Sequence, residues 1–421
     1  MADFVITNAT IVLADAIVEG GSVLIRDGLI VEVQSSTSLY TADGVDVLDA
    51  RGAYLLPGLI DLHNDALEFE INPRPRVDLP IPFALNCLEF RLLASGITTE
   101  FHAISFIERP GAARSVSNAR ERSAFIAALE TSGSPRAIEH HVQHRINVRD
   151  RAALEVVLSS LDALNVRFAS LNDHTPGQGQ YRDVTMLAER MKENQAARGP
   201  SYGSSDEAEL RQRMETAAAD AETVPYIYER VRAYAQHAQA YIATHDDHTP
   251  EKVDAQCEIG ATIAEFPITV ETARRARDRG MAIVVGAPNV VRGGSQSGNL
   301  AAHELIQEGL ADIICADYHA PSLLAAVMKI VRAGMLDLPS AVRMITLNAA
   351  QAVGLADRGA IQPGLRADIT LMRLDEYGFP VVEAVFSRGQ QSYSYGRGAL
   401  TTPANMGINA TVGIGASYDG D

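Results

Sequence analysis

The sequence has no tryptophan, only three cysteines and no apolar run of the length that a membrane-spanning helix needs. The cysteines, Cys87, Cys257 and Cys315, are odd in number and far apart, which argues against a disulfide framework or a zinc site of the CxxC type. The first residues, MADFVITNAT, lack the basic and apolar regions of a secretory signal. We therefore expect a cytoplasmic protein.

Lysine is also scarce, because Lys192, Lys252 and Lys329 are the only three and arginine supplies nearly all the positive charge. The formal net charge of −17 favours neither nucleic acid nor an anionic membrane surface as a partner. An anionic small molecule could bind only where arginines or metal ions reverse the local field. Biased genomic composition is an equally simple reason for the arginine content.

Hydrophobic patterning divides the chain into two kinds of structure. Residues 1–55 and 357–400 alternate apolar and polar positions with Gly or Asp at the breaks, as short β-strands do. Between them, short apolar runs alternate with longer helical stretches, which indicates βα units and a parallel sheet. The expected strands cover residues 55–63, 96–104, 136–148, 166–173, 241–247, 261–267, 282–288 and 311–317.

Eight strands of this kind predict an α/β fold, a (β/α)8 TIM-like barrel over residues 56–356. The two chain ends are predicted to form one small β-sandwich domain beside it. Residues 184–239 are rich in Ala, Glu, Arg and Met and predict two or more inserted helices, which form either a lid or an ordinary helical excursion. The Gly-rich residues 401–421 are predicted to be a flexible tail.

The motif PGLIDLHNDALE at residues 57–68 gives the strongest local signal for chemistry. An apolar strand ends in His63 and Asp65, and alternation along a strand puts these two side chains on one face. In a closed barrel that face lies at the C-terminal rim, where active sites are found. An imidazole beside a carboxylate suits a divalent metal ion. The same sequence pattern also occurs where a His and an Asp at a strand end are simply exposed to solvent.

Most of the 11 histidines stand at or beside the ends of the expected strands. Because the ends of parallel strands meet at one rim, these side chains are candidates for a shared cation site. His102, His140, His141 and His248 are more simply explained as hydrogen-bonded residues that hold no metal. The predicted metal ligands are His63, Asp65, His144, His174, His245 and Asp317.

Asp317, at the end of the last expected strand, is also the predicted catalytic residue. A carboxylate there can take a proton from a water whose pKa a metal ion has lowered from roughly 15.7 to about 7. The ligand set predicts Zn²⁺, as one ion or two, with Mn²⁺ or Fe²⁺ as alternatives.

Two Gly-rich loops are candidates for anion binding. HTPGQGQYRD at 174–183 contains Gln178 and Arg182, and NVVRGGSQSGN at 289–299 follows the seventh strand. Backbone N–H groups in such loops can hold phosphate oxygens, and arginines add charge-assisted bonds. Both loops could equally be plain turns, as could the NPRPRVDLP segment that carries Arg74. The predicted substrate-binding residues are Arg74, Gln178, Arg182, Arg292, Gly293, Gly294 and Ser295.

These motifs together resemble the amidohydrolase superfamily, with HxD where most members have HxH. SLNDHTPGQGQYRD, APNVVRGGSQSGN and DYHAPSLL are similar to one subgroup, the alpha-D-ribose 1-methylphosphonate 5-triphosphate diphosphatases of phosphonate catabolism. The resemblance covers about residues 1–400. It implies a metal-dependent hydrolase that cleaves a sugar triphosphate and releases pyrophosphate.

The sequence departs from that subgroup at several positions. His102 stands where an aspartate is expected, and Asn147 and Asp150 follow the His144-Arg145 pair of the third-strand segment, where the subgroup carries more His and Glu. None of the three lysines lies on an expected barrel strand, so the carboxylated lysine that bridges two metals in many relatives is excluded. A hydrolase of C–N bonds and a non-catalytic member are the alternatives. The expected partner is a small phosphorylated molecule, and a homodimer is a further possibility.

Overall fold

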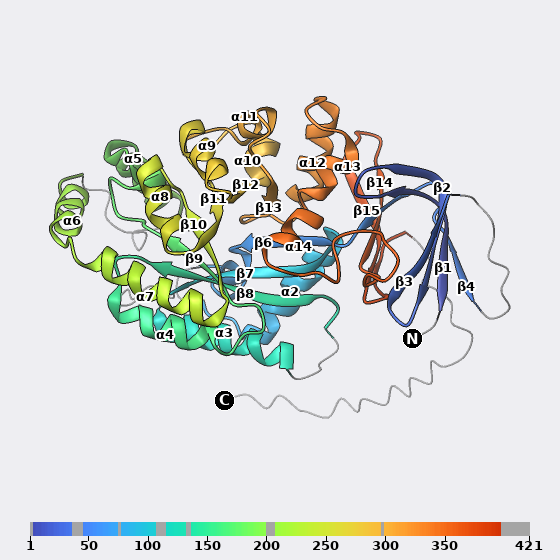
Figure 1. Ribbon diagram of the computed structural model, residues 1–421, viewed down its shortest axis with the longest axis horizontal. Coiled ribbons are helices and arrows are strands. Elements are labelled where there is room, and N and C mark those ends of the chain that lie inside the picture. Colours follow the sequence, from blue (N-terminus) through green and yellow to red (C-terminus); the bar gives the residue numbers. More distant parts are fainter. Residues whose placement is uncertain are drawn as a thin grey trace, which may run out of the picture.

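The computed structural model describes residues 3–35, 45–74, 77–106, 115–131, 136–198, 207–295 and 299–396. The tail predicted for residues 401–421 lies outside these residues. The described chain forms a barrel of strands and helices with a separate sheet packed against one end (Figure 1). None of the described helices is long and apolar enough to span a membrane.

Eight parallel strands form the barrel, and each pairs with the strand next to it in chain order. This confirms the predicted fold class, a (β/α)8 barrel with a small β domain at its side. The strands are β6 (Leu59–Asn64), β7 (Ile97–Phe106), β8 (Glu139–Asn147), β9 (Phe168–Asn172), β10 (Tyr241–His245), β11 (Ala261–Glu265), β12 (Ala282–Gly286) and β13 (Ile313–Cys315).

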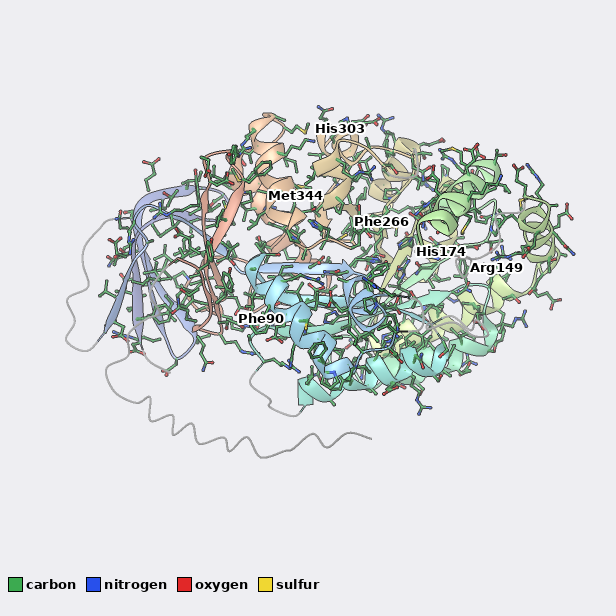
Figure 2. All side chains as sticks on the ribbon, turned by 180° about the vertical axis from the view of Figure 1, so that it is seen from behind. Phe90, Arg149, His174, Phe266, His303 and Met344 are labelled. Atoms are coloured by element: carbon green, nitrogen blue, oxygen red, sulfur yellow. The ribbon has the colours of Figure 1, made fainter. Side chains whose placement is uncertain are left out.

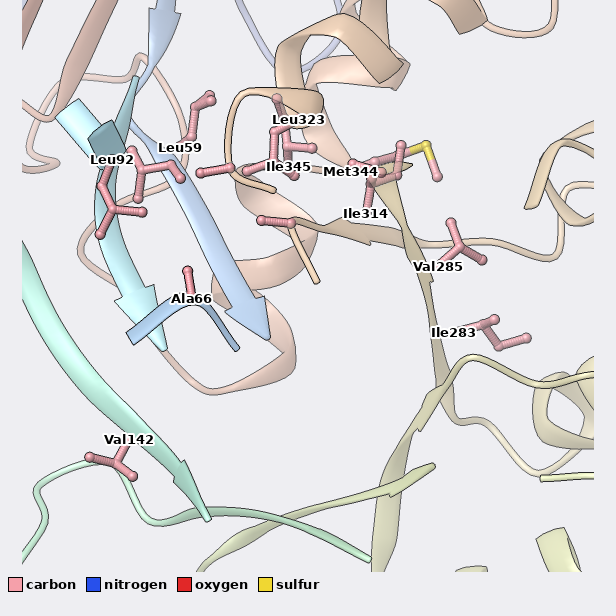
Figure 3. Packing of buried hydrophobic residues seen from close by; sticks show 14 of the residues in the cluster. Leu59, Ala66, Leu92, Val142, Ile283, Val285, Ile314, Leu323, Met344 and Ile345 are labelled. Atoms are coloured by element: carbon pink, nitrogen blue, oxygen red, sulfur yellow. The ribbon is translucent and has the colours of Figure 1, made fainter. Parts of the chain in front are cut away.

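Alternation along these strands divides the apolar side chains between two cores. Phe101, Phe168 and Ile263 fill the interior of the barrel with other buried apolar residues. Residues of the opposite face, among them Val142 and Val285, pack against the surrounding helices (Figure 3). The strands are therefore buried on both faces, which is why they appear in the sequence as nearly continuous apolar runs.

The barrel closes between its first and last strands, and it closes differently at its two ends. Near the N-terminal end of β6, the N–H of Ile60 donates to Ile345 O (3.0 Å), and the N–H of Ile314 in β13 donates to Met344 O (2.9 Å). Met344 and Ile345 are thus inserted between β6 and β13 (Figure 3). At the rim the two strands meet directly, because Asp317 N donates to His63 O at 2.9 Å.

The helices surround the barrel, mostly between successive strands (Figure 1). The insertion expected at residues 184–239 contains α5, α6 and α7. The helices are α1 (Ala66–Ile71), α2 (Ile81–Ala94), α3 (Val116–Thr131), α4 (Arg151–Leu161), a 3-10 turn η1 (Gly179–Tyr181), α5 (Val184–Arg198), α6 (Glu207–Ala219), α7 (Thr223–Ala238), α8 (Pro250–Glu258), α9 (Val270–Asp278), α10 (Ala287–Arg292), α11 (Ala302–Gln307), α12 (Ser322–Arg332), α13 (Leu338–Arg343) and α14 (Leu347–Ala352).

Both chain ends contribute to the second sheet, in the order β16-β15-β14-β5-β1-β2-β3, with β4 paired to β1. It is one bent sheet rather than two separate ones, because irregular register along β1 and β2 allows it to fold over itself. Phe4 consequently stacks on Phe386 at a centroid distance of 5.1 Å. The strands are β1 (Phe4–Val12), β2 (Ile17–Arg26), β3 (Leu29–Gln34), β4 (Asp46–Asp49), β5 (Tyr54–Pro57), β14 (Ile369–Leu374), β15 (Pro380–Ser387) and β16 (Gln390–Ser394).

Glu139 joins the sheet domain to the barrel. It begins β8 and accepts from Arg358 at 2.9 Å and from Arg366 at 2.5 Å, both on the segment that leads into the sheet domain. Burial by itself would raise the pKa of Glu139, but the hydrogen bond from His141 and the two guanidinium groups hold that pKa well below its usual value of 4.5. The ionised carboxylate therefore stabilises the folded chain.

We predict that Glu139→Gln lowers the free energy of unfolding by about 2–3 kcal/mol at pH 7, because two arginines lose their shared anion. Since the folded pKa is depressed, this contribution is present above pH 4.5 and is lost as the pH falls below that value. Urea unfolding at pH 7 and pH 4 measures both effects. Glu155→Gln, which breaks the exposed pair with Arg230, is the control and should cost under about 1 kcal/mol. Equal losses in the two variants would contradict the prediction.

Candidate metal centre

Polar side chains from several strands converge at the C-terminal rim of the barrel. β6 delivers His63 and Asp65, and the closing bonds at the rim bring them to Asp317 after β13. The N–H of Asp65 donates to Asp317 O at 2.7 Å, so the first and last strands are fixed to each other at this point. The backbone therefore determines the spacing of these three predicted ligands.

Three overlapping groups of side chains at this rim have ligand atoms that all lie within 4.8 Å of one another. The shared members are His63 and His245, so the groups form one continuous cluster. They are His63, Asp65 and Asp317; His63, His245 and Glu265; and His174, His245 and Asp246. Five of the six predicted metal ligands are thus brought together, and Glu265 and Asp246 join them.

The donor atoms of this cluster suit a divalent cation. His174 Nε2 is buried and has no hydrogen-bond partner. His63 Nδ1 lies 3.4 Å from Glu265 Oε1, and His245 Nδ1 lies 3.0 Å from Asp246 Oδ2, yet neither nitrogen has hydrogen-bond geometry. Buried polar atoms without partners are costly, and imidazole with carboxylate is a common ligand set for zinc. The residues present fit a bound metal ion.

Backbone strain accompanies the site at three strand ends. Positive φ values occur at Asp246 (55°) and Phe266 (54°), which directly follow β10 and β11, and at Asp317 (59°), just beyond β13. Non-glycine residues rarely adopt this conformation, and it clusters at functional sites. His174 and Phe266, both labelled in Figure 2, each contact the ring of His245, at centroid distances of 5.7 and 5.1 Å. The ring of Phe266 packs edge-on against both His63 and His245.

Arg145, on the inner face of β8, is a fixed cation within the cluster. Its Nη1 donates to both carboxylate oxygens of Asp65, at 2.8 and 3.1 Å. Its Nε and Nη2 donate to Asn172 Oδ1 at 3.2 and 3.1 Å, and Nη2 lies 3.5 Å from His245 Nε2. Burial would lower the pKa of Arg145, but Asp65 and nearby glutamates raise it, so the guanidinium stays charged.

The electrostatic environment gives the ligands different protonation tendencies. Burial, and the positive charge of Arg145, lower the pKa of His174 to about 3, which leaves it neutral and able to bind a cation. Burial, and the negative charge of Asp65, raise the pKa of Asp317 to about 6. A carboxyl group whose pKa is near neutrality exchanges a proton readily, as a general base requires.

The loop at 174–183 lies against this cluster. A side chain on Gly179 would approach Asp246 O to 3.0 Å, and Gly179 has a φ of 51°, so glycine permits the close packing. The ring of Tyr181 meets that of His174 at a centroid distance of 5.8 Å. Gln178 and Arg182, the predicted substrate-binding residues, are carried by this loop, where Gln178 is half-buried and Arg182 is exposed.

His144 lies elsewhere, contrary to its predicted role as a ligand. It faces the helix layer, where its Nε2 is 2.9 Å from the hydroxyl of Ser123 on α3 and its ring stacks on Phe106. Its strand neighbours Gln143 and Arg145 point into the barrel instead. Alternation along β8 puts adjacent residues on opposite faces, so the cluster of histidines on this strand could not supply them all to one site.

In the second Gly-rich loop, at 289–299, two backbone N–H groups that were predicted to bind phosphate make hydrogen bonds within the chain. Gly293 N and Gly294 N both donate to Asn289 O and so cap the last turn of α10. These two N–H groups are therefore engaged in the helix end, which corrects the expectation that they hold phosphate oxygens. Arg292 is exposed at that helix end, and Ser295 is half-buried just beyond it. Arg74, exposed after α1, contributes its carbonyl oxygen to a turn with Val77 N.

The residues that depart from the expected subgroup pattern have local structural partners. His102 Nε2 lies 2.9 Å from His140 Nδ1, and His140 Nε2 lies 2.9 Å from Glu89 Oε2, outside the barrel lumen. Asn147 accepts from Arg149 N, and Asp150 caps α4 by accepting from Ala153 N. None of the three departing residues, His102, Asn147 and Asp150, belongs to the candidate ligand groups of the described chain.

Sequence reasoning missed Glu265, Asp246 and Arg145. Glu265 accepts from Gln143 Nε2 at 2.5 Å and from Ser170 Oγ at 2.8 Å, and it is completely buried. The sequence did contain a signal for Glu265, because this charged residue ends the otherwise apolar strand β11. Ionised side chains are almost never fully buried without partners, so its position indicated a polar site.

We predict that His245→Ala lowers the bound metal to below half of the wild-type amount, because His245 belongs to two of the three ligand groups. His144→Gln should keep the wild-type metal content and cost about 1 kcal/mol of stability through its altered bond to Ser123. Metal analysis by mass spectrometry after dialysis, together with urea unfolding, measures both. Loss of metal from His144→Gln would show that the helix-facing position is wrong.

Comparison with known proteins agrees with this geometry. Residues 128–393 match the profile of the Amidohydrolase family. The alpha-D-ribose 1-methylphosphonate 5-triphosphate diphosphatase of Escherichia coli (strain K12) is 35% identical over 369 residues, which are 87% of this chain and 94% of that protein.

Solved structures of the same superfamily are similar in fold alone. An enamidase superposes with a TM-score of 0.61 at 15% identity and covers 94% of this chain and 97% of its own. N-acetylglucosamine-6-phosphate deacetylase from Pasteurella multocida superposes with a TM-score of 0.60 at 11% identity, over 93% of this chain and 100% of its own. By its sequence match and by its barrel, this chain belongs to the amidohydrolase family.

Proposed function

We propose that this chain is a metal-dependent hydrolase that cleaves alpha-D-ribose 1-methylphosphonate 5-triphosphate into the 5-phosphate and pyrophosphate. The observation that carries this proposal is the 35% identity to the Escherichia coli diphosphatase along nearly the whole of both chains. The convergence of histidines and carboxylates at the rim supports it, because that reaction needs a water nucleophile and compensation of phosphate charge.

The proposed ligands of the metal are His63, His174, His245 and Asp317, with Asp65, Glu265 and Asp246 beside them. A bound divalent cation would supply Lewis acidity and lower the pKa of water, and Zn²⁺ fits this mixed set of nitrogen and oxygen donors best. Mn²⁺ or Fe²⁺ would bind the same donors.

Asp317 is the proposed general base. Its side chain is half-buried, and its pKa of about 6 allows it to accept a proton from water and return it to the leaving group near neutral pH. The positive φ of Asp317 and its two backbone hydrogen bonds to β6 fix its orientation toward the cluster. This fixed orientation is what an acid–base residue requires.

Basic groups at the rim support an anionic substrate in spite of the net charge of −17. Arg145 lies in the cluster, and Arg149 and Lys252 lie beside the ends of β9 and β10, 3.4 Å from Asp173 and Asp247 respectively. Arg182 stands on the neighbouring loop. Arginine and lysine can offset the charge of phosphate oxygens as it redistributes in the transition state.

The function is tested by measuring pyrophosphate release from the ribose 5-triphosphate with Zn²⁺ or Mn²⁺ supplied. We expect the kcat/KM for this substrate to exceed that for ATP, for N-acetylglucosamine 6-phosphate and for a cyclic amide by at least about 10²-fold, since the site would be built for a sugar triphosphate. Faster cleavage of either of the last two compounds would instead assign the chain to the hydrolases of C–N bonds.

Asp317→Asn should lower kcat by about 10²–10⁴-fold while most of the metal stays bound, because the amide keeps one oxygen donor but cannot accept the proton. Steady-state kinetics and metal analysis of the same sample measure the two properties. Asp312→Asn is the matched control, because Asp312 precedes the same strand at the opposite end and pairs with Arg277. Unchanged turnover in Asp317→Asn would remove Asp317 from the mechanism.

A further inference from the structure

The position of Arg145 bears on how many metal ions the rim can hold. Its guanidinium contacts Asp65 at 2.8 Å on one side and lies 3.5 Å from His245 Nε2 on the other. Asp65 belongs to the ligand group of β6 and β13, and His245 belongs to the groups that include β10. The positive charge therefore lies between the two halves of the cluster.

Burial and hydrogen bonds fix the side chain of Arg145 in this position. The side chain is only 9% exposed, and Asn172 Oδ1 accepts from both its Nε and its Nη2. Asn172 itself is fixed, because its Nδ2 donates to Ser170 O at 2.9 Å. A guanidinium does not lose its proton in proteins, so its charge persists at every working pH.

β9 provides no anion that could join two ions at this place. Two metal ions that act together lie about 3.5–4 Å apart, so an anionic side chain between them lowers their mutual repulsion. The inward residues of β9 at the rim are Ser170 and Asn172, both neutral and both engaged, Ser170 by Glu265 and Asn172 by Arg145. The described lysines belong to α5, α8 and α12 rather than to a barrel strand.

We propose that the centre binds one divalent ion per chain and that the guanidinium of Arg145 takes the place of a second cation. This inference rests on the proposed metal-dependent function, and it assigns to Arg145 the task of a fixed positive charge beside the reacting phosphate. The two positive charges of one ion and the single charge of the guanidinium together balance the three negative charges of Asp65, Asp317 and Glu265. A second divalent ion would be repelled by the guanidinium within the same few ångströms.

The number of ions is measured directly, without reference to any substrate. The metal-free full chain is titrated with Mn²⁺ by calorimetry, and the Mn²⁺-saturated protein is examined by electron paramagnetic resonance. We expect one ion per chain and the six-line spectrum of an isolated Mn²⁺. Two ions per chain with an exchange-coupled spectrum would overturn the proposal.

The role of the charge is tested with Arg145→Met and Arg145→Lys. If Arg145 opposes a nearby cation, Arg145→Met should bind Mn²⁺ at least about tenfold more tightly than the wild type, while kcat falls by about 10²–10³-fold. Arg145→Lys keeps the charge and should bind Mn²⁺ with nearly wild-type affinity. If Arg145 only positions Asp65, Arg145→Met should instead bind Mn²⁺ more weakly, and that outcome would refute the electrostatic role.

Two measurements keep these results interpretable. Circular dichroism and the melting temperature of the metal-free variants establish that they fold. Ion stoichiometry and affinity do not depend on which substrate is cleaved. A chain that fails to release pyrophosphate but binds one Mn²⁺ therefore refutes the proposed substrate alone, and an active chain with two ions refutes the inference about Arg145 alone.

Discussion

The structure depends on the pair of backbone hydrogen bonds that close the barrel at its rim. Asp317 N donates to His63 O, and Asp65 N donates to Asp317 O, so residues from opposite ends of the barrel domain become neighbours. Ala316 N adds a bond to the buried carboxylate of Asp61 at 2.8 Å. Every other strand then takes its position between these fixed edges. The ligand cluster is a consequence of closure, since an open sheet would hold Asp317 far from His63.

Charge is the second constraint, because several carboxylates meet in a buried place within a chain that is already strongly acidic. Isolated buried anions are unstable, so each acid needs a partner. Arg145 pairs with Asp65, Gln143 and Ser170 donate to Glu265, and the remaining imidazole and carboxylate atoms fit a metal ion. The cations that compensate these acids are therefore part of the same cluster as the acids themselves.

The periodicity of the sequence was sufficient to predict the strands and the meeting of histidine and carboxylate side chains at their ends, because both follow from burial and from the common direction of parallel strands. The periodicity failed where a shift of one residue decides which face of a strand a side chain occupies. His144 and Arg145 are adjacent, yet alternation sends the first to α3 and the second to the site. The pattern also could not reveal that α10 consumes the amides of Gly293 and Gly294, because a helix end and an anion-binding loop both favour glycine.

The helical insertion is connected physically to the metal centre. Leu210 of α6 packs with Val184 and Leu187 of α5 in a small separate core, and Tyr181 rests against that core. The ring of Tyr181 in turn contacts His174, whose unpartnered nitrogen faces the cluster. Through this chain of contacts, α5 and α6 support the loop that carries Gln178 and Arg182. Because Tyr181 stands shortly before α5 in the chain, the loop and the inserted helices share one small core, and a change in that core would be transmitted to the ring beside His174.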